Sequence, residues 1–296
     1  MIKIANPEPF LRVIRAPNPS PLTGDGTNTY IIGQDDLCVI DPGPDNDQHL
    51  AAILGALAQG GQLRAILVTH AHLDHSPLSR ALARETGAPV YAFGNHLAGR
   101  SARMNALAAT AMVGGGEGTD IEFRPDQLVK DGGSIALGPD QITAIWTPGH
   151  FGNHLCFAWR GAVFSGDHVM GWSTTLVSPP DGDLSAYMAS LDKLEDMQPR
   201  VLYPGHGAPI PDPAQRIAFL RAHRLQREAE ILACLSQGDC MVEEIVQQVY
   251  RDHPVSLHHA AARNVFAHLI DLEARGVVEA LPELGQTARF RHIRRG

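Results

Sequence analysis

Short apolar runs recur along the chain, and their length and composition predict strands. Each run holds three to six residues and is rich in β-branched or aromatic side chains, which is typical of strands in a buried sheet. We expect the first run to lie at a sheet edge and the next two to form a hairpin. The predicted strands are 11–14, 28–33, 37–40, 65–68, 90–92, 135–137, 142–146, 162–164 and 201–203.

Apolar residues at helical spacing predict helices between these strands. One helix spans 48–60 and ends in glycines, a second begins at Pro77 and is closed by Gly87, and a third is capped by Asp183. The glycines within 94–118 are not followed by the lysine and the Ser/Thr that a phosphate-binding loop requires. We therefore expect 94–118 to be a flexible loop.

The chain beyond Pro211 predicts a second, smaller unit. Its elements are helices over 213–237, 241–251 and 257–275 and a hairpin of strands 277–281 and 289–293. Asp212 followed by a proline is typical of a helix start, and glycines follow the ends of the helices. Helices followed by a hairpin form a winged-helix layout, so we expect a main domain over 1–212 and a winged-helix-like domain over 213–296.

Chemically active side chains concentrate directly after the predicted strand 65–68. His70, His72, Asp74 and His75 place four metal-binding groups within six residues. Because the side chains of a strand alternate between its faces, the strand has to end before these groups can converge in a turn. Imidazole and carboxylate groups suit zinc, with copper, iron, nickel, cobalt and manganese as chemical alternatives. This density favours a metal site over unrelated surface histidines.

Three later turns repeat this design. In each of them a strand-like run ends, a glycine permits a tight turn and a ligand-type side chain follows at once. The ligand-type residues are His150, Asp167 and His206. One glycine turn with a histidine would be weak evidence, but four such places in order predict a site for two metal ions.

Length and cysteine usage indicate the number of domains and the cellular compartment. The 296 residues suit one large domain and one small domain. The four cysteines, Cys38, Cys156, Cys234 and Cys240, show neither metal nor disulfide spacing. We find no secretory pattern and no run of membrane-spanning length, so we expect a cytoplasmic protein without a membrane partner.

Charge is distributed unevenly along the chain. The net charge is -8, yet residues 216–296 hold 11 arginines and 10 acidic residues, which leaves 13 basic and 22 acidic residues elsewhere. The acidic main part disfavours tight nucleic-acid binding, which depends on neutralising phosphates. The basic side chains of the smaller unit gather at Arg289, Arg291, Arg294 and Arg295. We expect this unit to shape the rim of the site or a dimer contact, and duplex DNA is not an expected partner.

With seven ligand-type residues in this order, the sequence resembles the metallo-β-lactamase superfamily. The resemblance implies an α/β fold, a four-layer αββα sandwich, for the main domain. The ligand pattern that it assigns is His70, His72 and His150 for one metal, Asp74, His75 and His206 for the other, and Asp167 as the bridge. A bridging carboxylate is usual among the superfamily's hydrolases of esters, thioesters and phosphodiesters but not among its antibiotic-hydrolysing members. We therefore do not expect β-lactamase activity.

Three loops and the C-terminal layout are similar to one branch of that superfamily, the β-lactamase-like protein 2 type. The loops are 23–30, 171–175 and 183–191. The branch carries a C-terminal winged-helix domain and includes a single-strand endoribonuclease. The resemblance thus covers nearly the whole chain.

The resemblance also implies roles for individual side chains. Hydrolysis would use a hydroxide activated between two metal ions, and Asp74, besides being a ligand, is our candidate catalytic residue for orienting that nucleophile and moving its proton. Asp41 is expected to support the ligands from behind, and Ser76 to cap the following helix. His154 is a second candidate for support, although Asn153 stands where much of the superfamily has an aspartate.

Other polar side chains have no assigned role in that pattern. His168, next to a ligand, could face the substrate or be packed away, because neighbouring side chains alternate. His96, Arg100 and Arg103 could reach a substrate from the predicted loop 94–118.

Three functions stay open. The first is a β-lactamase-like protein 2 type hydrolase, including cleavage of single-stranded RNA. The second is an ester, lactone or thioester hydrolase similar to hydroxyacylglutathione hydrolases. The third is a metal-containing nucleic-acid-binding regulator, which the complete ligand set disfavours because a structural site needs no bridging carboxylate. We expect two Zn²⁺ ions as cofactors (other divalent metals stay open), a small molecule or single-stranded RNA as substrate, and a homodimer as an open alternative.

Overall fold

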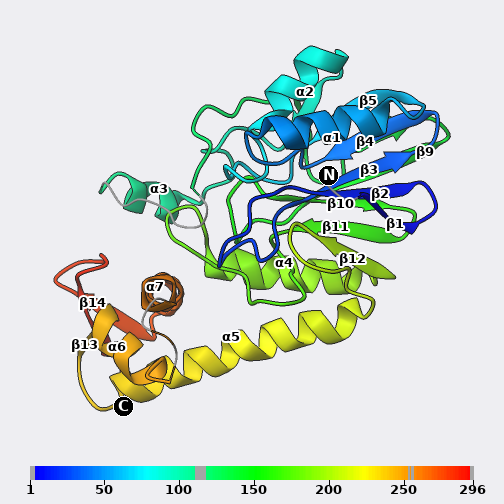
Figure 1. The fold of residues 1–296 in the computed structure, drawn as a ribbon. Helices are drawn as coiled ribbons and strands as arrows, with labels where there is room; N and C mark the ends of the chain where they lie inside the picture. The colour runs from blue at the N-terminus through cyan, green and yellow to red at the C-terminus, as the bar shows by residue number, and fades with distance from the viewer. Residues whose placement is uncertain (1–3, 111–117, 253, 255–256, 294–296) are drawn as a thin grey trace.

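Two β-sheets stacked against each other form the larger part of the molecule (Figure 1). The computed structural model describes residues 4–110, 118–252, 254 and 257–293. Buried apolar side chains from both sheets, among them Tyr30, Leu67, Phe157 and Phe164, fill the space between the sheets. Each sheet therefore turns one face to this shared core and the other face to helices.

The first sheet has seven strands in sequence order. They are β1 (Ile4–Glu8), β2 (Leu11–Arg15), β3 (Asn28–Gly33), β4 (Asp36–Ile40), β5 (Gln62–Leu67), β6 (Val90–Ala92) and β7 (Gln127–Leu128). The predicted hairpin is confirmed, with Tyr30 opposite Ile40 in the antiparallel pair β3–β4. The prediction that 11–14 lies at the sheet edge is wrong, because β1 pairs with β2 and takes the edge position.

The second sheet has five strands in the order β12-β11-β10-β9-β8. They are β8 (Ser134–Leu137), β9 (Asp140–Trp146), β10 (Leu155–Trp159), β11 (Ala162–Gly166) and β12 (Val201–Pro204). β11 and β12 are parallel, while β9 and β11 both pair antiparallel with β10. β9, β11 and β12 therefore run in the same direction, and the residues that follow them leave the sheet at one end.

Helices cover the outer face of each sheet and complete four layers (Figure 1). α1 (Asp47–Leu57) and α2 (Leu78–Thr86) pack on the first sheet, and α4 (Leu184–Asp196) and the beginning of α5 (Pro213–Leu235) pack on the second. Gly87 closes α2 in the left-handed region at φ 73, and Asp183 caps α4 by accepting a hydrogen bond from the Ala186 amide, as predicted. The predicted αββα sandwich is confirmed.

A short helix occupies part of the segment that we expected to be a loop. α3 (Ala102–Ala108) begins after Ser101, whose side chain accepts a hydrogen bond from the Met104 amide. Met104 and Leu107, three residues apart, are buried in the apolar cluster of the C-terminal unit. The loop prediction is therefore wrong for these residues, because a partner distant in sequence supplies the apolar contacts that stabilise so short a helix. The glycines at 114–116 lie outside the described residues.

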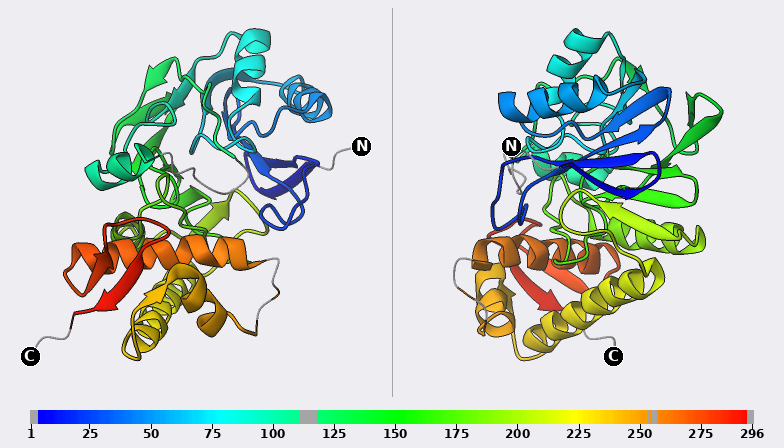
Figure 2. Two further views of the ribbon diagram at one scale, coloured as in Figure 1. Left: turned by 90° about the vertical axis from the view of Figure 1, so that its left-hand side faces the viewer. Right: turned by 45° about the vertical axis from the view of Figure 1, so that its right-hand side comes forward.

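The C-terminal unit consists of three helices and a small sheet, the predicted winged-helix layout. It contains the end of α5, α6 (Val242–Val249), α7 (His258–Ala274) and a sheet ordered β13 (Cys240–Met241), β15 (Arg289–His292), β14 (Val278–Leu281). Figure 2 shows α7 on the side of this unit that faces the sandwich, where Ala267 joins the cluster around α4.

The helix α5 belongs to both units. Near its beginning, Ile217 and Leu220 pack with Leu191 and Leu194 of α4, whereas Ile231 near its end is buried with the C-terminal helices. A domain boundary between residues 212 and 213 stays a proposal, because the start of α5 packs against the sandwich.

None of the helices in the described residues is long and apolar enough to cross a membrane. The four cysteines are buried free thiols. Burial raises the pKa of each thiol, to about 12 for Cys156. Buried thiols of this kind are inert.

Candidate metal centre

The seven ligand-type side chains converge at one end of the two sheets. His70, His72, Asp74 and His75 lie in the turn after β5, and the other three follow strands of the second sheet, at the end where β9, β11 and β12 all terminate: His150, Asp167 and His206. All seven are buried. Gly205 precedes the last ligand, and a Cβ there would come within 2.4 Å of Asp167 Oδ1 and 2.7 Å of His75 Cε1. The turn therefore needs glycine to let the ligands approach each other.

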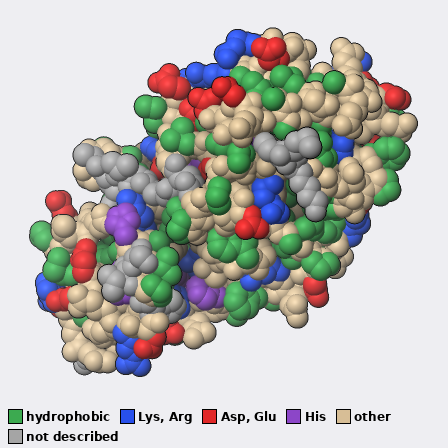
Figure 3. All heavy atoms as spheres, viewed as in Figure 1, with side chains coloured by type: hydrophobic (Ala, Val, Ile, Leu, Met, Phe, Trp, Pro, Cys, Tyr) green, Lys and Arg blue, Asp and Glu red, His purple; other side chains and the backbone are tan. Residues whose placement is uncertain are grey.

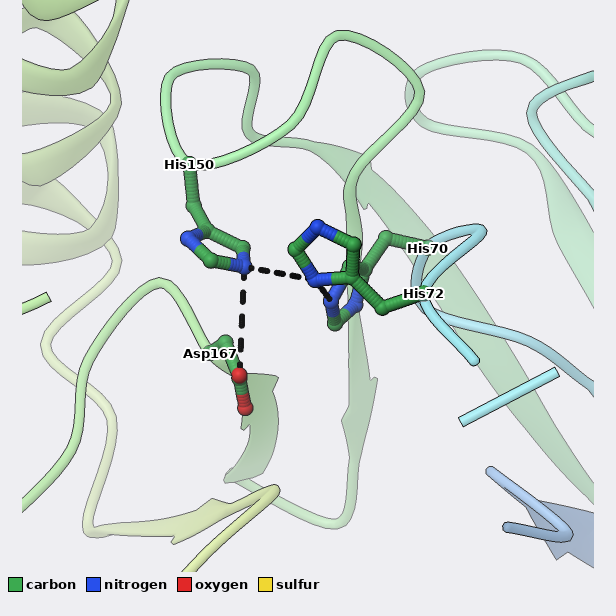
Figure 4. Close-up of side chains that lie close together, drawn as sticks. All are labelled: His70, His72, His150 and Asp167. Carbon is green, nitrogen blue, oxygen red and sulfur yellow. Dashed lines mark hydrogen bonds and ion pairs between the residues drawn. The ribbon is translucent and has the colours of Figure 1, made fainter. Parts of the chain in front are cut away.

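The first group of ligand atoms comprises three imidazoles and one carboxylate (Figure 4). His72 Nδ1 lies 2.8 Å from His70 Nε2 and 3.2 Å from His150 Nε2. The Nε2 atom of His150 lies 3.8 Å from Asp167 Oδ2. One ion could contact all four groups, because their ligand atoms lie within 4.8 Å of one another.

The second group comprises Asp74, His75 and His206. Asp74 Oδ2 lies 3.2 Å from His75 Nε2 and 3.1 Å from His206 Nε2. Asp167 also reaches this group, with Oδ1 at 3.4 Å from His75 Nε2 and Oδ2 at 3.3 Å from His206 Nε2. The Asp167 carboxylate therefore lies between the two groups.

Hydrogen bonds at the far side of four imidazole rings fix which nitrogen faces the centre. The Nδ1 atoms of His150 and His206 lie 2.8 Å and 3.3 Å from the carbonyl oxygens of Leu176 and Gly26. A carbonyl only accepts, so each Nδ1 carries the proton and Nε2 presents its lone pair. His72 differs, because its Nδ1 faces the other ligands and its buried Nε2 has no partner among the described residues.

Asp41 holds the two remaining rings. Its Oδ2 accepts a hydrogen bond of 2.9 Å from His75 Nδ1 and another of 2.8 Å from the Thr69 hydroxyl. Having donated to Asp41, the Thr69 oxygen accepts from His70 Nδ1 at 3.0 Å. Asp41 has φ 50, in the left-handed region that aspartate tolerates better than most residues. The structure thus places Asp41 behind the ligands, where the sequence pattern expected it.

The electrostatics of the centre suit a cation. Burial lowers the pKa of His70, and it lowers that of His72 to about 3, helped by the nearby imidazoles. Burial also opposes protonation of His75 and His206, but Asp74 and Asp167 outweigh it and raise the pKa of His206 to about 10. Positive charge at the point where the imidazole lone pairs converge would therefore stabilise the buried carboxylates. Two divalent ions would supply this charge, and the nitrogen and oxygen donors are a set typical of zinc.

Of three polar residues near the ligands, Ser76 does not act as predicted, His168 takes one of the two positions that were left open, and Asn153 supports the ligand turn. Ser76 does not cap α2; its hydroxyl lies 2.7 Å from Asp120 Oδ2 and 3.1 Å from the His72 carbonyl, which braces the ligand turn. His168 is packed away against Tyr187, where burial lowers its pKa to about 3. Asn153 supports the turn without a carboxylate, because its Oδ1 accepts from the Ala71 amide at 3.3 Å.

Of the remaining candidates from the sequence, His154 lies directly behind a ligand, and Arg100 and Arg103 lie away from the centre. His154 is buried behind His70, with ring centroids 5.1 Å apart, and its Nδ1 bonds to Thr147. Arg100 forms an ion pair with Asp181, and Arg103 pairs with Glu273 of α7. Together with His96 these arginines are absent from the residues that line the cavity at the metal centre. The expectation that they reach a substrate there is not supported.

A cavity of about 50 Å³ lies against the ligands. The wall opposite the ligands consists of Pro21, Leu22, Met170, Ser173, Thr174 and Leu176. Sequence reasoning did not identify these residues as a pocket wall, although it singled out the neighbouring loops 23–30 and 171–175. That resemblance was their only signal in the sequence, because only the tertiary fold brings Leu22 and Leu176 to the same cavity.

Comparison with known proteins gives matches over both units. Residues 22–206 match the metallo-beta-lactamase superfamily, and residues 242–286 match the beta-lactamase associated winged helix domain. A beta-lactamase-like protein 2 homolog of Drosophila melanogaster is 32% identical over 272 residues, 88% of this chain and 86% of that protein. An atrochrysone carboxyl ACP thioesterase of Aspergillus fumigatus is 32% identical over 235 residues, 76% of this chain and 65% of that protein.

Solved structures show the same arrangement. A metallo-beta-lactamase family protein from Thermus thermophilus superimposes with a TM-score of 0.76 at 25% identity, covering 97% of this chain and 99% of that one. A beta-lactamase domain protein from Burkholderia ambifaria gives a TM-score of 0.80 at 24% identity, with coverage of 98% and 93%. The likeness therefore extends over the sandwich and the C-terminal unit together.

Proposed function

The chain belongs to the metallo-beta-lactamase superfamily, with a beta-lactamase associated winged helix domain, and from this premise we propose that it is a dinuclear zinc hydrolase of small thioesters or carboxylic esters. The superfamily is one of hydrolases, and the two ligand groups provide places for two ions. The imidazole and carboxylate donors of both groups support zinc as the metal.

The composition of the cavity wall is the observation that supports an ester or thioester as the substrate. Besides the ligands, the cavity is lined by the apolar residues Leu22, Met170 and Leu176 and by Ser173 and Thr174, which carry hydroxyl groups. None of the described residues that line the cavity is a lysine or an arginine. A phosphodiester backbone would need such cations, whereas an acyl group gains from apolar contact. The small volume, about 50 Å³, also favours a compact acyl group.

The face of the molecule shown in Figure 3 gives RNA little support. On the face shown in Figure 3, Lys and Arg side chains are interspersed with Asp and Glu. Binding of single-stranded nucleic acid typically uses a positively charged groove with aromatic side chains. Cleavage of single-stranded RNA is therefore the second candidate, supported only by the likeness to the beta-lactamase-like protein 2 homologs. A nucleic-acid-binding regulator is the least supported, and duplex DNA is not a proposed partner.

In the proposed reaction the chain's own residues would hold the metal ions and orient the nucleophilic water. Bound zinc ions would activate a water molecule and polarise the substrate carbonyl. Asp74 Oδ2 accepts from Thr27 at 3.3 Å and faces His75 and His206, while Asp74 Oδ1 is buried without a partner among the described residues. Oδ1 is therefore available to accept a proton from the nucleophilic water. Asp167 keeps the two ligand groups together.

A relative's name points in the same direction. Several similar proteins are named atrochrysone carboxyl ACP thioesterases, among them those of Aspergillus fumigatus and Aspergillus chevalieri. A thioester carbonyl is an electrophile of the kind that this centre could activate. The likeness supports a thioester as the first substrate to test but does not identify its acyl group.

The test is a direct comparison of substrate classes. Zinc-loaded protein would be assayed with acyl thioesters of increasing chain length, matched oxygen esters, lactones and single-stranded RNA. Asp74→Ala, purified in parallel, serves as the control for contaminating activity. We expect a higher kcat/KM for a short-chain or aromatic thioester than for RNA. Faster cleavage of RNA than of every ester and thioester, lost in the control, would overturn the proposal.

A further inference from the structure

A strip of three residues, Thr175, Leu176 and Val177, connects the metal centre with the C-terminal helices. The strip belongs to the segment between β11 and α4, and its middle residue forms part of the cavity wall. Thr175 and Val177 are buried. Its hydrogen bonds run in two directions, toward the ligands and toward α5 and α7.

Toward the centre, the strip contacts two ligand residues. The Thr175 hydroxyl lies 2.9 Å from the carbonyl oxygen of Asp167 and 3.0 Å from that of His168. The Leu176 carbonyl accepts the hydrogen bond of 2.8 Å from His150 Nδ1 that fixes the tautomer of that ring. A shift of the strip would therefore move the acceptor that orients one ligand and the backbone that carries another.

Toward the helices, the strip is held by Arg224 of α5 and Asn264 of α7. Arg224 donates to the Thr175 carbonyl through Nη2 and to Asn264 Oδ1 through Nη1, the latter at 3.0 Å. Asn264 Oδ1 also accepts from the Val177 amide at 3.1 Å. Each of the two side chains thus contacts both the strip and the other.

The burial of Arg224 sets it apart from the other arginines of α5. It is 3% exposed, and among the described residues no carboxylate forms an ion pair with it. Burying a charge costs several kcal/mol unless hydrogen bonds compensate for it, and those of Arg224 go to the strip and to Asn264. Arg221, one turn earlier, lies at the surface and pairs with Asp192 and Glu195.

We propose that Arg224 and Asn264 are positioning residues through which the C-terminal unit sets the metal centre and the cavity wall. They fix the position of the strip, and the Leu176 carbonyl of the strip fixes the orientation of the His150 ring. The Leu176 side chain limits the size of the acyl group that the cavity can accept. The specificity part rests on the proposed function, whereas the effect on metal binding does not. This gives α5 and α7 a role at the site without any contact between them and the substrate.

Asn264 offers a matched pair of variants. Asn264→Leu keeps the number and branching of the side-chain heavy atoms but removes the acceptor for the Val177 amide and for Arg224, whereas Asn264→Asp keeps an acceptor oxygen at the same place. Arg221→Ala removes a surface ion pair of the same helix and serves as the control. For each protein we would measure thermal unfolding, zinc affinity by competition with a chelator, and KM and kcat for the best substrate.

We expect Asn264→Leu to weaken the binding of one of the two zinc ions by roughly three- to ten-fold, less than the loss of a direct partner of a ligand. KM should rise more than kcat falls, and the preference for acyl length should broaden. Asn264→Asp should restore zinc affinity and KM, and Arg221→Ala should leave both unchanged. Lower melting temperature in Asn264→Leu with zinc affinity and KM at the wild-type values would overturn the proposal.

The design separates this proposal from the proposed function. If no thioester or ester is hydrolysed but Asn264→Leu still weakens zinc binding and Asn264→Asp restores it, the positioning role stands and the substrate class falls. If Asn264→Leu does not fold, Arg224→Lys is measured instead, because a single ammonium head cannot reproduce the forked contact with Thr175 and Asn264. Unchanged zinc affinity in folded Arg224→Lys would then overturn the positioning role.

Discussion

Asp41 Oδ2 lies 2.9 Å from His75 Nδ1, and through Thr69 the same carboxylate also holds His70. His75 belongs to one ligand group and His70 to the other. One residue that belongs to neither ligand group therefore orients a member of each. This arrangement explains why an aspartate stands at a turn with φ 50, where a glycine would fit more easily but has no side-chain carboxylate to accept these hydrogen bonds.

We expect Asp41→Ala to lower zinc affinity by about 10- to 100-fold, because both rings lose the acceptor that fixes their orientation. Asp41→Asn retains one acceptor oxygen and should fall between the wild type and Asp41→Ala. Chelator competition on folded protein measures the effect. Wild-type affinity in both variants would show that packing alone orients the rings.

Much of this arrangement can be predicted from the sequence, for a physical reason. The ligands follow strands directly, and strands that run in the same direction end at one edge of a sheet, so short apolar runs followed by His or Asp predict convergence. His150, Asp167 and His206 were predicted in this way. The helices with local signals, such as the Asp183 cap of α4, were likewise predictable, because a cap bonds within one turn.

Features that depend on distant partners could not be predicted. α3 needs the apolar cluster of the C-terminal unit, and Ser76 bonds to Asp120 rather than to its own helix. Arg224 has the spacing of an ordinary helix residue, and nothing local distinguishes it from Arg221. Its burial results from the packing of α5 against α7 and the strip, which only the folded chain brings together.

We expect the zinc-replete protein to bind about two zinc ions per chain, because seven ligands exceed one tetrahedral site. Asp167→Ala should reduce the content, since this carboxylate contacts both groups. Metal analysis after removal of loosely bound ions provides the measurement. Saturation at one ion, with no change in Asp167→Ala, would contradict a dinuclear centre.

We expect Asp74→Ala to lower kcat by about 10²- to 10⁴-fold, the range of a proton-transfer group, with the fold retained. Asp74→Asn, which keeps the shape but is a poor proton acceptor, should lose nearly as much. Circular dichroism and metal content must be measured together with turnover. Retained turnover at unchanged metal content would assign the proton transfer to another group.

The stability of the protein should fall as pH decreases from 6.5 to 4, in part because of His49. Thr29 donates to the Asp41 carbonyl at 2.7 Å, so His49 Nε2 donates to Thr29 at 2.7 Å and the buried Nδ1 has no partner among the described residues. Burial lowers the pKa of His49 from 6.5 to about 4. The unfolded chain therefore binds a proton first, and the lost stability amounts to at most about 3 kcal/mol.

His49→Gln keeps a donor for Thr29 and does not titrate, so it is the matched variant for this effect. Unfolding by denaturant at pH 7 and at pH 4.5 should show a smaller loss in the variant than in the wild type. Titration of the metal ligands affects both proteins equally and cancels in the comparison. An equal loss in both would assign the pH dependence to other groups.

The winged-helix-like unit should not bind duplex DNA in a salt-sensitive way, because Arg289 and Arg291, the arginines of its strand β15, are already paired with carboxylates. Arg289 lies 3.2 Å from Glu244, and Arg291 lies 2.7 Å from Asp239 and 3.1 Å from Glu279. A DNA reader releases counterions in proportion to the phosphates that it neutralises, so its affinity falls steeply with salt. Paired guanidinium groups would have to break these contacts first.

Fluorescence anisotropy with a labelled duplex at about 50 and 200 mM salt tests this, with Asp239→Asn, which frees Arg291, as the comparison. We expect weak binding with a shallow salt slope, slightly steeper in Asp239→Asn. Tight binding by the wild-type protein that falls about a thousand-fold over this range, and disappears in Arg289→Ala/Arg291→Ala, would show that the unit is a DNA reader.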